Sequence, residues 1–451
     1  MTILTLHGCL VHYFLALLMP MAVVIDHAGI YAFQPQQFNI ARHRPKNAVV
    51  VKQSAVSLAR STTPTVPTRI QLQSSTSSSS SSFSANTTTD PTKPLKGCIC
   101  LVTGASRGIG KGIALELGTA GAVVYITGTS SSDSTMTPPS SKENAAATAL
   151  YSTSEETGGP GTIEETARLV TEAGGVGIPV YCNHANDDQV QALMDKIQRD
   201  HGRLDILVNN AFRIPPGAPK SLFKPFWEQG AECWDTVHTV GLRSHFVATC
   251  MAMPLLQRAQ QTPNNNNNNN NNMARPLIVM ISSFGGLTYT FNTPYGVAKA
   301  AVDRMAKDMA VELGDSMCVV SLWPGLVMTE RTKQTQETGD WDEYVQLPLI
   351  DGLVESPQFT GQAIVALAVD KDNSKRTGKY HVVAELAEEY DFDDVVTGFR
   401  PPSIRSLRFL APTYGMTEEQ RKNISINSIP NWKLPFWVMA MGQPPKKANQ
   451  S

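Results

Sequence analysis

Two side chains with acid–base chemistry stand four residues apart in the segment ISSFGGLTYTFNTPYGVAKAAVDRMAKDM, which covers residues 281–309. They are Tyr295 and Lys299. A helix that begins at the preceding proline would place both on one face, because residues i and i+4 are neighbours on a helix. A serine pair, Ser282 and Ser283, lies just upstream. An amphipathic helix can also carry a tyrosine and a lysine at this spacing by chance, so a catalytic and a structural interpretation both stay open.

The surrounding chain alternates short apolar strands with helical patterns once its polar insertions are set aside. Strands are expected at residues 98–103, 122–127, 176–182, 204–208, 277–282, 317–323 and 379–383. Helices are expected near residues 108–120, 162–174, 187–201, 232–258, 294–313 and 356–369. This alternation predicts an α/β fold with one Rossmann-type, doubly wound parallel sheet that helices cover on both faces. Such sheets bind ligands at the carboxyl ends of their strands, so functional residues are expected just after each strand.

The first strand ends in the glycine-rich turn TGASRGIG, residues 103–110, and a helix follows at once. Gly104, Gly108 and Gly110 allow a tight turn and a close approach to a pyrophosphate at the amino end of that helix. The spacing differs from the GxGxxG motif, and a P-loop is excluded because Gly112 stands where Ser or Thr must follow the lysine. Such a turn can simply cap a helix, but its position after the first strand favours dinucleotide binding.

Four motifs, in this order, resemble those of the short-chain dehydrogenase/reductase family. They are TGASRGIG after the first strand, NNA at residues 209–211 after the fourth, a serine after the fifth, and Tyr-x-x-x-Lys on the next helix. The similarity covers roughly residues 95–385. It implies an oxidoreductase that reduces a small-molecule carbonyl group, or oxidises the alcohol, by hydride transfer with a nicotinamide cofactor. The alternatives are a catalytically idle dinucleotide-binding sensor or scaffold, and a membrane-anchored structural subunit.

The resemblance assigns catalytic roles to three residues. Tyr295 is the expected proton donor and acceptor, Lys299 is expected to bind the nicotinamide ribose, and a serine is expected to hold the substrate oxygen. Ser283, twelve residues before the tyrosine, is favoured over Ser282, since only one of two successive strand residues can face Tyr295. A free phenol has a pKa near ~10. We expect the lysine ammonium and an oxidised nicotinamide to favour the phenolate.

The resemblance also implies which residues bind the cofactor. The expected set is Gly104, Ser106, Arg107, Gly108, Ile109, Gly110, Thr129, Asn183, Asn210, Ala211, Tyr295, Lys299, Pro324, Gly325 and Thr329. The second strand ends in YITGTSSS, without the acidic residue that an NAD enzyme uses to hold the ribose hydroxyls. Arg107 is placed to meet a phosphate on the adenosine ribose. NADPH/NADP is therefore the expected cofactor, with NAD as the alternative.

Two positions depart from the family pattern. Gly241 stands where the family usually has an Asn that anchors a water molecule in a proton relay. Asn183 stands where the family usually has an Asp beside the adenine, and its side-chain oxygen could still accept a bond from the adenine amino group. The change at Gly241 predicts either a different route for protons or a lower turnover.

Composition sets residues 1–95 apart, and the resemblance to the family covers residues 96–385, which leaves residues 386–451 as a C-terminal extension. The first part holds seven Lys/Arg and two Asp/Glu, and its apolar run at residues 9–25 has the length of a signal peptide. A hydroxyl-rich, acid-poor stretch follows, and this order resembles the bipartite presequences of algae with complex plastids. We expect a disordered, removable organellar presequence with the plastid as its destination. An anchor in the endoplasmic reticulum membrane is the alternative.

The middle part is the expected NAD(P)-binding domain, with low-complexity insertions at residues 129–161 and 264–272 and a mobile substrate lid at 330–355. The seven cysteines have no metal-ligand spacing, so no metal site is expected. No basic stripe indicates a nucleic-acid partner. Analogy with the family predicts a homodimer or tetramer. Aromatic residues of the C-terminal extension could contact a lipophilic substrate or a membrane surface, or simply pack on the domain.

Overall fold

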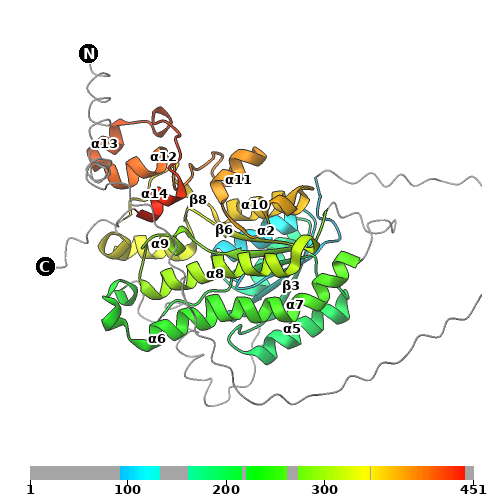
Figure 1. Ribbon diagram of the computed structural model, residues 1–451. Helices are drawn as coiled ribbons and strands as arrows, with labels where there is room; N and C mark the ends of the chain where they lie inside the picture. Colours follow the sequence, from blue (N-terminus) through cyan, green and yellow to red (C-terminus); the bar gives the residue numbers. More distant parts are fainter. Residues whose placement is uncertain (1–91, 133–160, 216–219, 262–272, 346, 442–451) are drawn as a thin grey trace, which may run out of the picture. The chain divides into compact units, whose positions relative to one another are not determined.

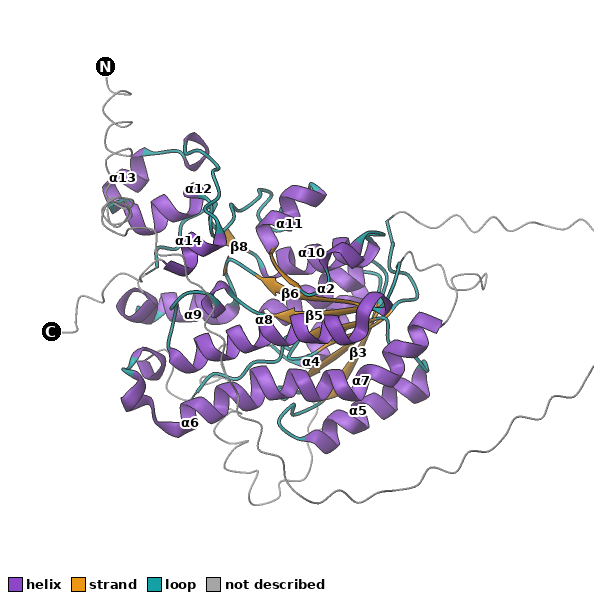
Figure 2. Ribbon diagram, viewed as in Figure 1, coloured by secondary structure: helices purple, strands orange, loops and turns teal. Residues whose placement is uncertain are grey.

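Seven parallel strands form the central sheet, in the order β3-β2-β1-β4-β5-β6-β9. Figure 1 and Figure 2 show this sheet with helices packed around it. They are β1 (Ile99–Val102), β2 (Val123–Gly128), β3 (Val176–Tyr181), β4 (Ile206–Asn209), β5 (Leu277–Ile281), β6 (Cys318–Trp323) and β9 (Lys379–Val382). The order reverses between β1 and β4, and a sheet of this kind binds its ligand at the carboxyl ends of the strands beside such a reversal. The predicted fold class is confirmed.

The computed structural model describes residues 92–132, 161–215, 220–261, 273–345 and 347–441. All of them belong to one compact unit, residues 83–451. The insertion expected at residues 264–272, and nearly all of the expected presequence and of the first insertion, lie outside the described residues. Within the described ranges, no helix is long and apolar enough to cross a membrane.

Helices cover both faces of the sheet. One face carries α2 (Gly108–Thr119), α4 (Ile163–Glu172), α10 (Pro357–Val369) and α11 (Val383–Tyr390). The other carries α5 (Asp187–Asp200), α7 (Ser244–Gln261) and α8 (Thr293–Leu313). Successive strand residues contribute to opposite cores: Leu101 joins the core with α5 and α7, whereas Cys100 and Val102 join the core with α2 and α10. The burial of both strand faces explains why the strands are almost continuously apolar.

Side-chain caps fix where two of these helices begin. The Asn186 side chain accepts from the N–H of Gln189 at 3.1 Å at the start of α5, and the Asn292 side chain accepts from the N–H of Tyr295 at 2.8 Å at the start of α8. Pro294 stands in the first turn of α8, where a missing N–H costs nothing. Because Asn292 is buried, its cap holds the backbone of Tyr295 in a fixed position.

The long helix expected at residues 232–258 is in fact two helices. α6 (Phe226–His238) ends at the π-helical turn η2 (Thr239–Arg243), and α7 follows. The interruption is at Gly241, whose φ of 141° is rarely adopted by residues with a side chain. The sequence pattern did not reveal the break, because buried residues keep a helical spacing on both sides of it.

The segment expected to be a mobile lid contains regular structure. β7 (Leu326–Val327) pairs in parallel with β8 (Val354–Glu355), and α9 (Glu330–Glu337) lies between them in the chain. The C-terminal extension adds α12 (Leu407–Leu410), α13 (Glu418–Asn423) and α14 (Phe436–Met441). The remaining short helical turns are η1 (Lys220–Phe223), η3 (Phe284–Gly286), η4 (Gly314–Ser316), η5 (Trp341–Val345), η6 (Asn373–Arg376), η7 (Ala411–Gly415) and η8 (Ile426–Ser428).

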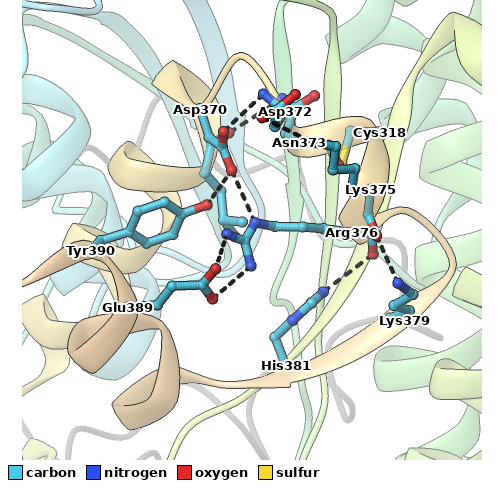
Figure 3. A network of polar contacts seen from close by, with 11 residues as sticks. Cys318, Asp370, Asp372, Asn373, Lys375, Arg376, Lys379, His381, Glu389 and Tyr390 are labelled. Atoms are coloured by element: carbon cyan, nitrogen blue, oxygen red, sulfur yellow. Dashed lines mark hydrogen bonds and ion pairs between the residues drawn. The ribbon is translucent and has the colours of Figure 1, made fainter.

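A polar network closes the edge of the sheet next to β9, as Figure 3 shows. Arg376 donates to both carboxylate oxygens of Glu389, at 2.7 and 2.9 Å, and to Asp370 at 3.0 Å. Tyr390 donates to the same Asp370 carboxylate. The network joins the end of α10, the turn before β9 and the end of α11. Because it lies at the amino ends of the strands, away from the ligand-binding edge, we assign it a structural role.

Candidate active site

The first turns of α8 bring Tyr295 and Lys299 to the end of β5. Lys299 is buried, and its Nζ donates to the backbone oxygen of Ile281, the last residue of β5, at 3.0 Å. The chain after β5 passes directly over the phenol ring, since a Cβ added to Gly285 would lie 2.7 Å from Tyr295 Cε1. Both side chains therefore stand at the edge of the sheet where the fold predicts a ligand.

The two serines after β5 point in different directions. Ser283 accepts from the N–H of Gly285 at 3.0 Å, and its hydroxyl interacts with the phenol of Tyr295. Ser282 donates instead to the backbone oxygen of Lys299 at 3.1 Å and is buried against α8. Of the two, Ser283 is the serine beside the phenol.

Loss of hydration controls the ionisation of both groups. It raises the pKa of Tyr295 to about 12, which the Ser283 hydroxyl opposes, and it lowers the pKa of Lys299 to about 8. Tyr295 is only partly buried, so water reaches part of its side chain. We expected the neighbouring ammonium, together with an oxidised nicotinamide, to lower the phenol pKa; the ammonium by itself does not offset the cost of ionising this poorly hydrated phenol. At neutral pH the phenol keeps its proton and can donate it.

One turn beyond Lys299, α8 carries a buried carboxylate that we did not predict. Asp303 Oδ1 accepts from Ser321 Oγ at 2.6 Å and from Trp323 Nε1 at 3.0 Å. Burial raises the pKa of Asp303. Burial also lowers the pKa of Lys299, and the negative charge of Asp303 partly offsets that lowering. Asp303 thus supports the lysine ammonium. The signal was available in the sequence, because Tyr295, Lys299 and Asp303 repeat every four residues on one helix face.

Phe212, the residue that follows the NNA motif, fills the space beside Tyr295 and Lys299. Its ring meets the Tyr295 ring edge-on with centroids 5.9 Å apart, and the Lys299 ammonium lies 4.9 Å from its centroid. A Cβ added to Gly241 would lie 2.7 Å from Phe212 Cδ2. An asparagine at this position and the phenylalanine ring cannot share this space. The departure from the family pattern at Gly241 is therefore coupled to Phe212.

A buried imidazole lies one turn after Gly241. His245 Nε2 is 3.0 Å from the backbone oxygen of Ala211, and Nδ1 is buried with no hydrogen-bond partner in the part of the chain that the structure describes. Burial, together with the nearby charge of Lys299, lowers the pKa of His245 to about 3. The ring is therefore neutral, and its contact with Ala211 indicates that Nε2 carries the proton. His245 fixes the backbone after β4 and is not an acid at neutral pH.

The glycine-rich turn packs closely against the chain after β4. Gly104 has a φ of 65°, and a Cβ there would lie 2.7 Å from Ala211 Cα. A Cβ on Gly110 would lie 2.4 Å from the backbone oxygen of Gly104. Asn210 Nδ2 donates to the backbone oxygens of Thr103 and Gly104, each at 2.9 Å. The NNA motif thus holds this turn at the start of α2. Of the other residues predicted from the turn, Ser106 lies two residues before α2, and Gly108 and Ile109 are the first two residues of that helix.

The side chain of Arg107 reaches from the glycine-rich turn to the end of β2. It donates to the Ser130 hydroxyl at 2.7 Å and to the backbone oxygen of Gly161 at 3.1 Å. Burial lowers the pKa of Arg107, and the Glu330 carboxylate opposes this shift. Thr129, the neighbour of Ser130, is exposed. A cation therefore stands at the strand end where the adenosine ribose is expected.

Asn183, expected beside the adenine, is already engaged by protein donors. Its Oδ1 accepts from the N–H of Ala185 at 3.1 Å and from Arg213 Nη2 at 3.2 Å. An amide oxygen has two lone pairs, so a contact with adenine through this atom requires Arg213 to move. No motif in the sequence indicates a role for this arginine, which comes from the loop after β4.

The turn after β6 rests on a buried carboxyl group. Glu355 accepts from the N–H of Gly325, and a Cβ on Gly325 would lie 2.5 Å from Glu355 Oε1. Burial raises the pKa of Glu355 to about 8. Thr329 caps α9, and its methyl group lies 3.6 Å from the position of a Cβ on Gly108. The segment from Pro324 to Thr329 therefore reaches the glycine-rich turn.

A small apolar cavity of about 10 Å³ adjoins the turn that begins at Ser283. Its lining is Phe284, Leu287, Thr288, Trp323, Ile404, Arg405, Phe436 and Met439. The last four come from the C-terminal extension, and the Phe436 ring meets the Trp323 ring edge-on with centroids 5.8 Å apart. The extension thus packs on the domain beside the candidate site. Among the described residues, no cluster of His, Cys, Asp and Glu could hold a metal ion.

Comparison with known proteins gives matches over most of the folded part. A family model described as enoyl-(acyl carrier protein) reductase matches residues 141–385. The chain is 36% identical over 307 residues to dehydrogenase/reductase SDR family member 1 of Mus musculus, a match that covers 67% of this chain and 84% of the relative. It is 28% identical over 282 residues to a 3-oxoacyl-(acyl-carrier-protein) reductase of Thermotoga maritima, covering 62% of this chain and 93% of the relative.

A solved structure shares the fold. It is a short chain dehydrogenase from Mycobacterium thermoresistibile, with a TM-score of 0.50 and 23% sequence identity. The match covers 68% of this chain and 93% of that chain. At this identity the likeness supports the architecture and nothing finer.

Proposed function

The chain belongs to the short-chain dehydrogenase/reductase family, and from that premise we propose that it reduces a small carbonyl compound with NADPH. The observation that carries the proposal is the arrangement at the end of β5, where Ser283 and Lys299 flank the partly buried phenol of Tyr295. A protonated phenol beside a hydroxyl and an ammonium can deliver a proton to an oxygen that gains negative charge.

In this mechanism Ser283 donates a hydrogen bond to the substrate oxygen, and Tyr295 transfers its proton to that oxygen. The pKa of about 12 keeps the phenol protonated at neutral pH, which suits the reductive direction. Lys299, supported by Asp303, binds the nicotinamide ribose and stabilises the phenolate that remains. The bound cofactor supplies the hydride. Phe212 limits the access of water to this side of the phenol.

The amino end of α2 fits the pyrophosphate of a dinucleotide. A helix start offers N–H groups that lack partners within the helix and favours negative charge. The Gly108 N–H already donates to a carboxylate oxygen of Glu330 at 2.8 Å, so this helix end accepts an anionic oxygen. Gly104 and Asn210 would hold the turn close to the cofactor, and Arg107 would meet the ribose phosphate.

We predict that NADPH is used with a KM roughly ten- to a hundredfold below that of NADH, because a charge-assisted bond to Arg107 adds binding energy for the extra phosphate. Arg107→Ala should remove most of this difference by weakening NADPH alone. Steady-state kinetics with both cofactors measure the effect, and Arg199→Ala, an exposed arginine on α5, is the control. Equal or better kinetics with NADH in the unmutated protein would refute the preference.

We also predict that Ser283→Ala lowers kcat about a hundredfold, as expected when one hydrogen-bond donor to a developing oxyanion is removed. Ser282→Ala should have a smaller effect, because that hydroxyl bonds the backbone of α8. Turnover of the two variants under saturating NADPH decides between them. A larger loss in Ser282→Ala would move the role to that residue.

The proposed function is tested by NADPH consumption with a panel of ketones, aldehydes, quinones and steroids. Tight NADPH binding without turnover of any substrate would favour the alternative of an idle sensor or scaffold.

Proposals for assembly and location follow from exposed side chains and from the sequence. α7 and α8 expose the apolar side chains of Phe246, Val297 and Val311, which supports a homodimer or tetramer formed through these helices. The plastid as destination stays a proposal from the sequence alone, as does membrane contact through the C-terminal tail, where Trp432 and Trp437 are exposed.

A further inference from the structure

An acidic side chain lies at the amino end of α2. Glu330 Oε2 accepts from the N–H of Gly108, the first residue of that helix, at 2.8 Å. The same N–H is one of the donors that a pyrophosphate would use at this helix end. Two anions cannot share so small a region without strong repulsion. The Glu330 carboxylate and a cofactor phosphate therefore compete.

Backbone structure positions both partners of the contact between Gly108 and Glu330. Glu330 is the first residue of α9, and the amino end of that helix also favours a carboxylate. Thr329 caps α9 with its hydroxyl, and its methyl group lies 3.6 Å from the position of a Cβ on Gly108. The start of α9 thus lies against the glycine-rich turn, and Glu330 does not reach it merely by an extended side chain.

The next residue, Arg331, is a cation without a counter-ion. Its guanidinium makes no hydrogen bond or ion pair within the residues that the structure describes, and it is partly buried. The bond between Gly108 and Glu330 brings their chain neighbours Arg107 and Arg331 to the same place. Burial lowers the pKa of Arg331, and the positive charge of Arg107 lowers it further. Two cations held together in this way favour an anion beside them.

We propose that Glu330 and Arg331 control the binding of the cofactor pyrophosphate, Glu330 by competing with it for the Gly108 N–H and Arg331 by pairing with its charge. This inference rests on the proposed function. When a nicotinamide cofactor binds, the Gly108 N–H passes from the Glu330 carboxylate to a phosphate oxygen, and Arg331 neutralises that phosphate. Glu330 holds the turn in its binding conformation before the cofactor enters and weakens the bound cofactor afterwards. Arg331 binds the pyrophosphate that NADPH and NADH share, whereas Arg107 binds the phosphate that only NADPH carries on its ribose.

The test is equilibrium binding of NADPH and of NADH to the full-length chain, followed by nucleotide fluorescence. Glu330→Gln keeps the shape and an acceptor for the Gly108 N–H but removes the charge, so both cofactors should bind about fivefold tighter. Arg331→Met should weaken both about tenfold and by the same factor. Glu337→Gln, an exposed position on the same helix, is the matched control and should change neither.

The outcomes separate this inference from the function on which it rests. Unchanged or weaker binding in Glu330→Gln, while the unmutated chain binds NADPH, would overturn the competition. A loss confined to NADPH in Arg331→Met would overturn the assignment of that residue to the pyrophosphate. If neither cofactor binds to any of the four proteins, the proposed function fails, and the inference fails with it.

Discussion

Replacing Tyr295 with phenylalanine is expected to lower kcat at least about a thousandfold while the dissociation constant for NADPH stays within a factor of about two. The substitution removes only the hydroxyl, which is the proton donor in the proposed reaction. The aromatic ring remains to fill its place between Phe212 and the chain after β5, and Asn292 still caps the backbone of α8. Turnover with excess substrate and NADPH fluorescence titration measure the two quantities.

A matched substitution makes the result specific. Tyr289→Phe removes a hydroxyl from an exposed tyrosine a few residues earlier and should change neither turnover nor cofactor binding. If Tyr295→Phe loses NADPH affinity together with activity, the residue is mainly structural. If it keeps substantial turnover, the proton comes from another group and the proposed mechanism is wrong.

The sheet and its main helices were predictable because they follow strong local signals. Continuous apolar runs give the buried parallel strands, and Asn292 with Pro294 gives the start of α8 within one residue of expectation. The folding of the C-terminal extension could not be predicted in this way. Its short helices are held by tertiary contacts such as the packing of Phe436 on Trp323. No periodic pattern in the sequence indicates such contacts.

The candidate site likewise contains residues that could be predicted from the sequence and residues that could not. Residues inside short motifs, such as Tyr295 and Lys299, could be named because those motifs resemble the family's, although their spacing alone left a structural interpretation open. The groups that set their chemistry come from distant segments: Phe212 follows β4, and Glu330 begins α9. Phe212 and Glu330 reach the site only because the folded sheet brings the carboxyl ends of its strands together, which local sequence does not indicate. The ionisation of Tyr295 could not be predicted in this way, because the rise in its pKa depends on loss of hydration in the folded chain.

Restoring the usual family residue by Gly241→Asn is expected to destabilise the fold by about 3 kcal/mol and to lower activity. The position has a φ of 141°, and a Cβ there would lie 2.7 Å from Phe212 Cδ2. Backbone strain and overpacking each cost on the order of 1–3 kcal/mol. The clash also pushes Phe212 toward Tyr295 and Lys299, which its ring contacts. Urea denaturation gives the change in the free energy of unfolding, and steady-state assays give kcat.

The control for this substitution is Gly202→Asn, just after α5. Gly202 also has a positive φ, 71°, but a Cβ there would have no neighbour nearer than 3.8 Å, and asparagine tolerates the left-handed region. Its cost should stay below about 1 kcal/mol. A Gly241→Asn variant that is as stable as the unmutated chain and turns over faster would contradict the coupling to Phe212. It would mean that the chain accepts the family's asparagine relay and gains from it.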